Sequence, residues 1–229
     1  FVTVVVGANL DKFVVHEALL IRYSKFFRAA LTNGMKETQE KAVTLADEGP
    51  ETFELFVHWL YYRRFPDAAK GDNQELVDLY TNVNDKGCLE TRHLVLLFIF
   101  GDRYIIPGLK QDSIDALYHY VCDKENIYLP QFRLVRFAFE NLPSTSPMCS
   151  VLVDLYCYFQ RPDAYDDVGE NELPPSALLA LLARYTSLAH KGETSGKGEI
   201  EYELNLCDYH EHETDEEKKA CKANQRKKN

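Results

Sequence analysis

The start of the chain has the pattern of two short strands joined by a turn. Residues 1–6 are β-branched and apolar, residues 7–12 supply turn-forming side chains, and residues 13–15 favour a strand again. This order predicts a hairpin, because β-branched residues favour strands and Gly, Asn and Asp favour the turn between them. Val43 and Leu45 alternate with other residues and predict one more short strand. The first part of the chain is therefore expected to form a small sheet.

Helical spacing begins directly after the hairpin. Leu20, Phe27 and Leu31 fall on one face of a helical pattern that starts at Glu17. Ser24 stands where one helix can end and a second can be capped. We therefore expect two short helices between the hairpin and the third strand.

A longer helix is predicted from Pro50, because proline is accepted in the first helical turn. The apolar positions that follow recur at spacings of three and four, which is the stripe that a helix buries against a core. This stripe consists of Phe53, Phe56, Val57, Leu60 and Tyr61. Trp59, the single tryptophan of the chain, lies off the centre of the predicted stripe.

Prolines and apolar stripes mark the later helices. A deeply buried helix is expected over residues 91–104, and another follows Pro107 and Gly108. Three further segments each begin with proline and carry an apolar stripe, namely residues 130–142, 147–159 and 174–190. In the last segment the predicted stripe is Leu178, Leu181, Leu182, Tyr185 and Leu188. These segments predict a helical extension.

Two stretches lack such patterns. Residues 64–90 are rich in Gly, Pro, Asn and Asp around one brief apolar piece, and we expect a long, mobile surface insertion there. Beyond Lys191 the chain becomes rich in Gly and charge, acidic over 211–217 and basic over 218–228. This composition predicts a charged tail that ends in disorder.

Composition narrows the class of protein. The net charge of -10 disfavours nucleic acid as a partner, because phosphate binding needs clustered Lys and Arg. The longest apolar run, residues 94–100, is far shorter than the roughly 20 residues of a membrane-spanning helix, so no membrane partner is expected. The six cysteines lack the spacing of a disulfide scaffold and predict an intracellular protein, nuclear or cytoplasmic. Phe1 stands inside a predicted strand, so we expect the natural chain to begin earlier.

Three segments together resemble the BTB/POZ domain family. The first carries the spacing F-x-x-H-x-x-x-L-x-x-x-S-x-x-F through Phe13, His16, Leu20, Ser24 and Phe27. The second, residues 53–62, is similar to the aromatic helix of that family. The third, residues 101–109, looks like its A-D-K/R-Y-x-I/L/M-x-x-L segment, with Gly101 in place of the usual alanine.

The resemblance implies an α+β fold of the BTB/POZ type, in which helices cap a small sheet. We expect this domain over residues 1–128, with the insertion at 64–90. An all-α extension is expected over residues 129–190, and a charged tail over residues 191–229. On one hypothesis, a zinc ion holds a small segment of this tail together.

Members of the BTB/POZ family self-associate, recruit protein partners, and in many cases act as substrate adaptors for cullin-type ubiquitin ligases. The resemblance therefore implies a non-enzymatic protein-interaction module that forms a homodimer or a higher homo-oligomer. The alternative is an oligomerisation scaffold, or a transcription-associated assembly protein, with no ligase role. No feature of the sequence names the partner or the substrate.

Met35 and Glu37 follow the second predicted helix and resemble the hydrophobic-x-Glu element with which cullin-binding members contact the ligase scaffold. An apolar side chain beside a carboxylate offers a pocket-filling contact and an orienting charge. The alternative is a solvated loop with one exposed methionine, because three-residue patterns also arise by chance.

Four residues near the end of the chain are of metal-ligand type: Cys207, His210, His212 and Cys221. Zinc favours thiolate and imidazole in a tetrahedral set, and four protein ligands leave no open position for water. One hypothesis is therefore a structural zinc that staples the tail. The alternative is a tail without metal, because the two histidines lie closer together than is usual and their neighbours are highly charged.

An enzyme built on the Cys/His cluster is a third hypothesis. No recognisable nucleophile-base pair, phosphate-binding loop or cofactor fingerprint accompanies the cluster. His16 stands before an apolar helix face with no nucleophile placed by a recognisable motif, so we expect a packed, hydrogen-bonded structural histidine. We therefore expect no catalytic residues, and no cofactor other than zinc.

Overall fold

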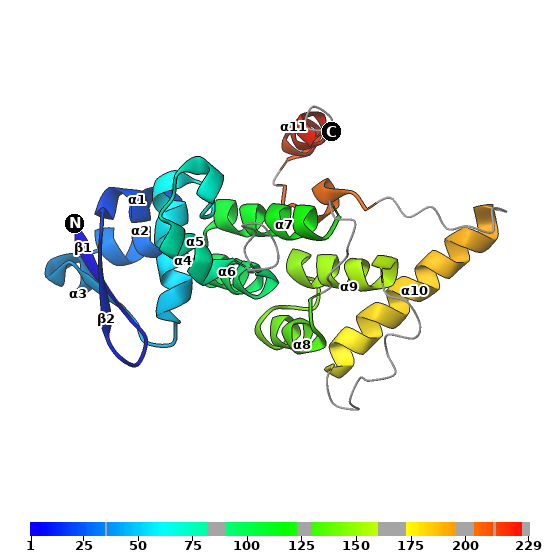
Figure 1. The fold of residues 1–229 in the computed structure, drawn as a ribbon, viewed down its shortest axis with the longest axis horizontal. Helices are drawn as coiled ribbons and strands as arrows, with labels where there is room; N and C mark the ends of the chain where they lie inside the picture. Colours follow the sequence, from blue (N-terminus) through cyan, green and yellow to red (C-terminus); the bar gives the residue numbers. More distant parts are fainter. Residues whose placement is uncertain are drawn as a thin grey trace. The chain divides into compact units, whose positions relative to one another are not determined.

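The chain divides into two compact units, Phe1–Ser113 and Ile114–Asn229. The computed structural model describes residues 1–34, 36–81, 90–122, 130–159, 173–195, 204–212 and 214–225. The division falls inside helix α7 (Pro107–Cys122), which begins in the first unit and ends in the second (Figure 1). The boundary predicted at residue 128 lies outside the described residues.

A three-stranded sheet, in the order β2-β1-β3, opens the first unit. The strands are β1 (Val2–Val6), β2 (Asp11–Val15) and β3 (Ala42–Leu45). β1 pairs antiparallel with β2 and parallel with β3. Along β1, Val2, Val4 and Val6 are buried whereas Thr3 and Val5 are partly exposed. One face of the sheet therefore packs on a core, and the predicted hairpin and third strand are confirmed.

The rest of the described part of the first unit is mainly helical. In chain order they are α1 (Glu17–Tyr23), α2 (Lys25–Thr32), α3 (Lys36–Glu40), α4 (Pro50–Tyr62), the 3-10 helix η1 (Ala68–Lys70), α5 (Gln74–Tyr80), α6 (Thr91–Arg103) and the start of α7. α1 contacts both α2 and α4, α3 contacts β3, and α4 contacts α6 (Figure 1). The two short helices after the hairpin and the helix that begins at Pro50 are confirmed. With the sheet, they give the predicted α+β fold.

Ser24 joins the ends of three helices. It is 1% exposed, and its Oγ accepts the Phe27 N–H at 3.0 Å, which caps α2. The same hydroxyl donates to the carbonyl of Tyr104, directly after α6, at 2.7 Å. The buried Ser24 side chain therefore caps α2 at the residue where α1 ends. It also holds both helices against the end of α6.

Aromatic side chains from α2, α4 and α6 fill the core of the first unit. Phe27, Phe53, Phe56 and Phe100 are buried. The ring centroids of Phe56 and Phe100 lie 4.9 Å apart, and Phe27 stacks on Phe56 at 6.4 Å. Pairs at such separations add stabilisation beyond that of buried area. Tyr61 was expected in the buried stripe of α4 but is 41% exposed, so the stripe ends earlier than predicted.

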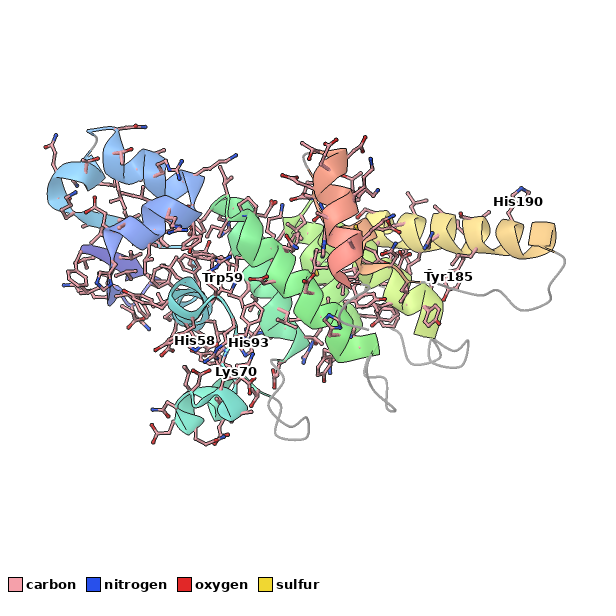
Figure 2. The ribbon with its side chains drawn as sticks, turned by 90° about the horizontal axis from the view of Figure 1, so that it is seen from above. His58, Trp59, Lys70, His93, Tyr185 and His190 are labelled. Carbon is pink, nitrogen blue, oxygen red and sulfur yellow. The ribbon has the colours of Figure 1, made fainter. Side chains whose placement is uncertain are left out.

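Trp59 is fully buried, although it lies off the centre of the predicted stripe. Its indole N–H donates to the Asp112 carboxylate at 2.7 Å, and the Arg63 guanidinium lies 3.6 Å from the ring centroid. These contacts satisfy the polar edge of the indole and cover its face, so the ring can enter the core. Figure 2 labels Trp59 beside His58 on α4.

The predicted insertion contains a helix, so the expectation that its composition resists regular structure is wrong over the described residues 64–81. Val77 and Tyr80 of α5 are buried. The Tyr80 hydroxyl donates to the Glu54 carboxylate of α4 at 2.5 Å. The apolar piece of this segment is therefore part of the core, and residues 82–89 of the prediction lie outside the described part of the chain.

Asp72 closes the turn that precedes α5. Its buried carboxylate forms an ion pair with Arg64, and Arg64 Nη2 donates to Asp72 Oδ1 at 2.8 Å. The Asp67 N–H also donates to Asp72 at 2.8 Å, and His58 Nε2 lies 3.4 Å from the carboxylate. These hydrogen bonds, led by those from Arg64, hold the pKa of Asp72 well below its usual range against the effect of burial.

The second unit is helical throughout its described part. Its elements after α7 are α8 (Phe132–Asn141), α9 (Pro147–Phe159), α10 (Pro175–Ser195), the 3-10 helix η3 (Leu206–Tyr209) and α11 (Asp215–Gln225). α9 contacts α8, α10 and η3, and its side chains Met148, Leu152 and Leu155 are buried (Figure 1). The three proline-led segments are helices, as predicted.

α10 buries only part of its predicted stripe. Leu181 and Leu188 are buried, but Leu178 and Leu182 are exposed, and Leu179 is 66% exposed. Apolar residues occur on every side of this helix, so their spacing does not decide which side packs. α10 consequently presents leucine side chains to solvent.

The charged tail contains a helix as well, and the expectation of disorder in the last dozen residues is wrong for residues 218–225, which lie in α11. Acidic residues occupy the first turn of α11 and Lys222 its last turn, which is the favourable arrangement relative to the helix dipole. The Thr214 hydroxyl accepts the Glu217 N–H at 3.2 Å. The Thr214 cap and the placement of acidic residues at the start and a basic residue at the end therefore favour this helix, although it has no apolar stripe.

We predict that Ser24→Ala lowers the free energy of unfolding of the first unit by about 2 kcal/mol, because the cap of α2 is lost and the Tyr104 carbonyl loses its partner. Urea denaturation followed by the fluorescence of Trp59 reports on this unit, since Trp59 is the single tryptophan. Thr32→Ala, at an exposed position of α2, is the control and should change the midpoint little. An equal effect of both variants would contradict the role given to Ser24.

A second prediction concerns acid. Because the folded-state pKa of Asp72 is lowered, its contribution to stability is present above about pH 4, where the unfolded carboxyl is ionised, and is lost as pH falls toward the folded-state pKa. Asp72→Asn should therefore lower the urea midpoint at neutral pH and reduce the further loss on acidification. Asp47→Asn, at an exposed carboxyl, is the control. An unchanged acid dependence in Asp72→Asn would exclude this carboxylate as its source.

Candidate functional site

The end of the described chain brings the predicted metal ligands together. Single ligand atoms of Cys207, His212 and Cys221 all lie within 4.8 Å of one another. Cys207 Sγ is 3.2 Å from His212 Nε2, and His210 Nδ1 is 3.1 Å from Cys221 Sγ. Two thiols and two imidazoles thus form one cluster, which we call the Cys/His cluster.

Hydrogen bonds hold the segment that carries three of these residues. The Asn205 side chain accepts a backbone N–H at 3.1 Å and caps η3. The Tyr209 hydroxyl donates to Asp154 of α9 at 2.7 Å, and the Tyr118 hydroxyl of α7 donates to the Leu204 carbonyl at 2.5 Å. Asp154 is also ion-paired with Arg184 of α10. The segment from residue 204 to 210 is therefore bonded directly to α7 and α9, and α10 supports it through Asp154.

Asp115 is a member of the site that the sequence did not identify. Its Oδ1 lies 2.6 Å from His210 Nε2, the ring nitrogen on the side away from Cys221. The His210 side chain is only 3% exposed. Asp115 lies on α7, far from the cluster in sequence, and no local motif marks it. Only the folded arrangement of α7 against the segment after residue 204 brings the carboxylate to the ring.

The protonation of the cysteines follows from their surroundings. Burial, together with the neighbouring Cys207 thiol, raises the pKa of Cys221 to about 11. Burial also raises the pKa values of Cys149 and Cys157 on α9 to about 12. These thiols are consequently protonated near neutral pH when no cation is bound, and a bound divalent metal would act in the opposite direction.

The predicted cullin contact is described only in part. Met35 lies outside the described residues. Glu37 lies on α3 and is partly exposed. The Thr38 hydroxyl donates to the Ala30 carbonyl at 3.1 Å and fixes α3 to α2. No hydrogen bond or ion pair of the Glu37 carboxylate occurs among the described residues.

The residues of the family signature have structural roles. His16 Nδ1 is hydrogen-bonded to the Tyr61 hydroxyl at 2.6 Å, which confirms the expected hydrogen bond, although the histidine is exposed and not buried. Phe13 contacts Phe53 with ring centroids 4.9 Å apart. Leu20 is buried in the core. The contacts of these signature residues therefore hold the first unit together.

A search for membrane-spanning helices in the described part of the chain found none that is long and apolar enough. A search of curated proteins found no match.

A family comparison identifies the first unit. The model of the BTB/POZ domain family matches residues 1–85, which include the sheet, helices α1 to α5, and two of the three segments that carry the resemblance. BTB/POZ domains are protein-interaction modules and are typically not enzymes. The small sheet with its covering helices and the matched residues agree, and this chain is therefore a BTB/POZ domain-containing protein.

Proposed function

We propose that this protein self-associates through its BTB/POZ unit and recruits further proteins, as a substrate adaptor for a cullin-type ubiquitin ligase. The observation that carries self-association is an exposed apolar surface at the β2 edge of a domain whose family commonly dimerises. The ligase role rests separately on Met35 and Glu37.

The surface consists of Phe1, Val14, His16 and Tyr61, and is called the β2 surface below. Val14 is 67% exposed. His16 follows two residues later, and residues two apart in an extended segment face the same side. The His16 ring lies 4.2 Å from that of Phe1 and 5.6 Å from that of Tyr61, centroid to centroid. The β2 surface is thus contiguous and largely apolar.

A second copy of this chain is the occupant that we propose for the β2 surface. β2 is an edge strand, and within the described residues it pairs with β1 alone. An edge strand offers unpaired backbone groups, and exposed apolar side chains beside it favour association over solvation. An isologous contact places the same surface on both partners, so one apolar patch is enough for a dimer.

The ligase contact is proposed at α3. Glu37 is held on a short helix that is fixed to α2, and its carboxylate has no partner among the described residues. A partly exposed, unpaired carboxylate on a rigid element can orient a partner protein at little entropic cost. Met35 would supply the apolar anchor beside it.

A separate surface, on α10, is available to bind other proteins. Leu178, Leu179 and Leu182 of α10 are exposed, and leucines at this spacing suit a partner that buries apolar side chains. If the ligase role is absent, self-association and this surface together describe an oligomerisation scaffold. That scaffold is the second candidate function.

We predict that Val14→Lys with Tyr61→Lys weakens self-association about tenfold or more, because two charges would enter an apolar contact. Light scattering across a dilution series measures the mass of the full chain. Leu10→Lys, at an exposed position in the turn just before β2, is the matched control and should retain the mass of the unmodified chain.

The double variant Leu179→Lys with Leu182→Lys tests the competing surface. Self-association should survive in this variant, because the proposal assigns that contact to the β2 surface. Loss of mass in the α10 variant, with an unchanged mass in the Val14 and Tyr61 variant, would contradict the proposal and place self-association on α10.

The ligase role predicts a complex between the full chain and the N-terminal domain of a cullin. Met35→Ala with Glu37→Ala should abolish this complex and leave the mass of the chain alone unchanged. Glu40→Ala, an exposed carboxylate of the same helix, is the control and should bind as the unmodified chain does. The absence of a complex with the unmodified chain would exclude the adaptor role and leave the scaffold.

A further inference from the structure

We propose that the second unit binds one structural zinc ion through four side chains: Cys207, His210, His212 and Cys221. The ligand atoms would be the two Sγ atoms, His210 Nδ1 and His212 Nε2. This inference is independent of self-association and of the ligase role, and it concerns how the end of the chain is folded.

The distances fit a tetrahedral site. Zinc bonds of about 2.3 Å to sulfur and about 2.0 Å to nitrogen place adjacent S and N ligands roughly 3.5 Å apart. Cys207 Sγ and His212 Nε2 are 3.2 Å apart, and His210 Nδ1 and Cys221 Sγ are 3.1 Å apart. Cys207, His212 and Cys221 also lie within 4.8 Å of one another. His210 lies outside that group of three and joins it through Cys221, so it would close in as the fourth ligand when the ion binds.

Asp115 supports His210 as a ligand. A metal-binding imidazole usually donates its other ring N–H to a carboxylate or a carbonyl, which fixes the tautomer and orients the ring. Asp115 Oδ1 lies 2.6 Å from His210 Nε2, so Nε2 carries the proton and Nδ1 is left to bind the ion. We assign Asp115 as the positioning residue of the site.

The exposure of α11 is an independent reason for a metal. From Asp215 to Ala223 each side chain is exposed, apart from Cys221, which is partly buried. A polar helix of this length gains little stability on its own, because most helical stability in proteins comes from packing of an apolar face. α11 has no such face. Cys207 Sγ already reaches the Lys218 carbonyl at 3.8 Å, and a bond from Cys221 to zinc would add a much stronger attachment at the same place.

A catalytic triad is a competing explanation of the same atoms, since Cys221, His210 and Asp115 are in contact in that order. A triad requires neither a second thiol nor a second imidazole, yet Cys207 and His212 stand within ligand distance. The Cys207 side chain is also buried. The complete set of two thiols and two imidazoles is accounted for by a closed zinc site, which leaves no position for a substrate.

A disulfide between Cys207 and Cys221 is the other competing explanation. It would employ the two sulfur atoms, but it would leave both histidines and Asp115 without a role. Zinc and a disulfide predict different masses and different metal contents, so one sample distinguishes them.

The test begins with the unmodified full chain, purified with a reductant and exposed to zinc before removal of free metal. We expect about one zinc per chain, since four ligands complete one tetrahedron. Replacement by cobalt(II) should give the visible absorption of a tetrahedral site together with sulfur-to-cobalt charge transfer. A metal-free chain, or a chain two protons lighter because of a disulfide, would overturn the proposal.

Variants identify the ligands. Cys207→Ser and His212→Gln should each lose most of the bound zinc. Cys157→Ser and His190→Gln, which change the same residue types in the same unit outside the cluster, are the controls and should retain it. Zinc that remains in both ligand variants would overturn this assignment, because a triad or an unrelated site does not depend on Cys207 and His212.

Asp115→Asn tests the positioning role by competition with a chelator. Loss of such a supporting carboxylate usually weakens metal affinity about 10–100-fold. Asp208→Asn, a neighbouring exposed carboxylate, should leave the affinity unchanged. Equal effects of the two variants would show general electrostatics and would contradict the assignment of Asp115.

Hydrogen exchange gives a readout that needs no substitution. Removal of zinc should expose the backbone amides of α11 to fast exchange, whereas the buried amides of α9 should remain protected. Equal protection of α11 with and without zinc would contradict the inference that the metal fastens this helix.

Discussion

The packing of aromatic side chains between α2, α4 and α6 is the interaction on which the first unit depends. A three-stranded sheet is too small to bury its own apolar face, so β1 requires a helical layer. Phe56 contacts the rings of both Phe27 and Phe100 and links the three helices of that layer. Ser24 adds the directional bond that sets α2 against the end of α6. These contacts leave the opposite face of the sheet and the β2 edge open to a partner.

The second unit is organised differently. Its helices pack on the buried residues of α9, and the segment after residue 204 combines buried side chains of η3, Leu206 and Tyr209, with polar contacts. The Tyr209 hydroxyl reaches Asp154, and His210 reaches Asp115. α11 has no apolar stripe of its own, so a bound metal ion would add the bonds that fasten it to this segment.

The sequence predicted those elements whose apolar pattern matches the face that they bury. The three strands and the helix from Pro50 belong to this class. The burial of Trp59, off the centre of its stripe, could not be predicted, because it depends on Asp112 and Arg63, polar partners that no periodicity reveals.

The remaining differences have the same origin in long-range or polar contacts. α5 was missed because Asp72 and Arg64 organise a turn whose composition suggests only a loop. α11 was missed because a polar helix formed by capping has no stripe to detect. The Cys/His cluster was predicted from residue types and spacing alone, whereas Asp115 required the fold.

Sedimentation of the unmodified full chain over a dilution series tests the central claim most directly, because an interaction module that self-associates must do so without any added partner. The account predicts a mass above that of one chain in the micromolar range, falling reversibly on dilution. A single-chain mass at every concentration would contradict it.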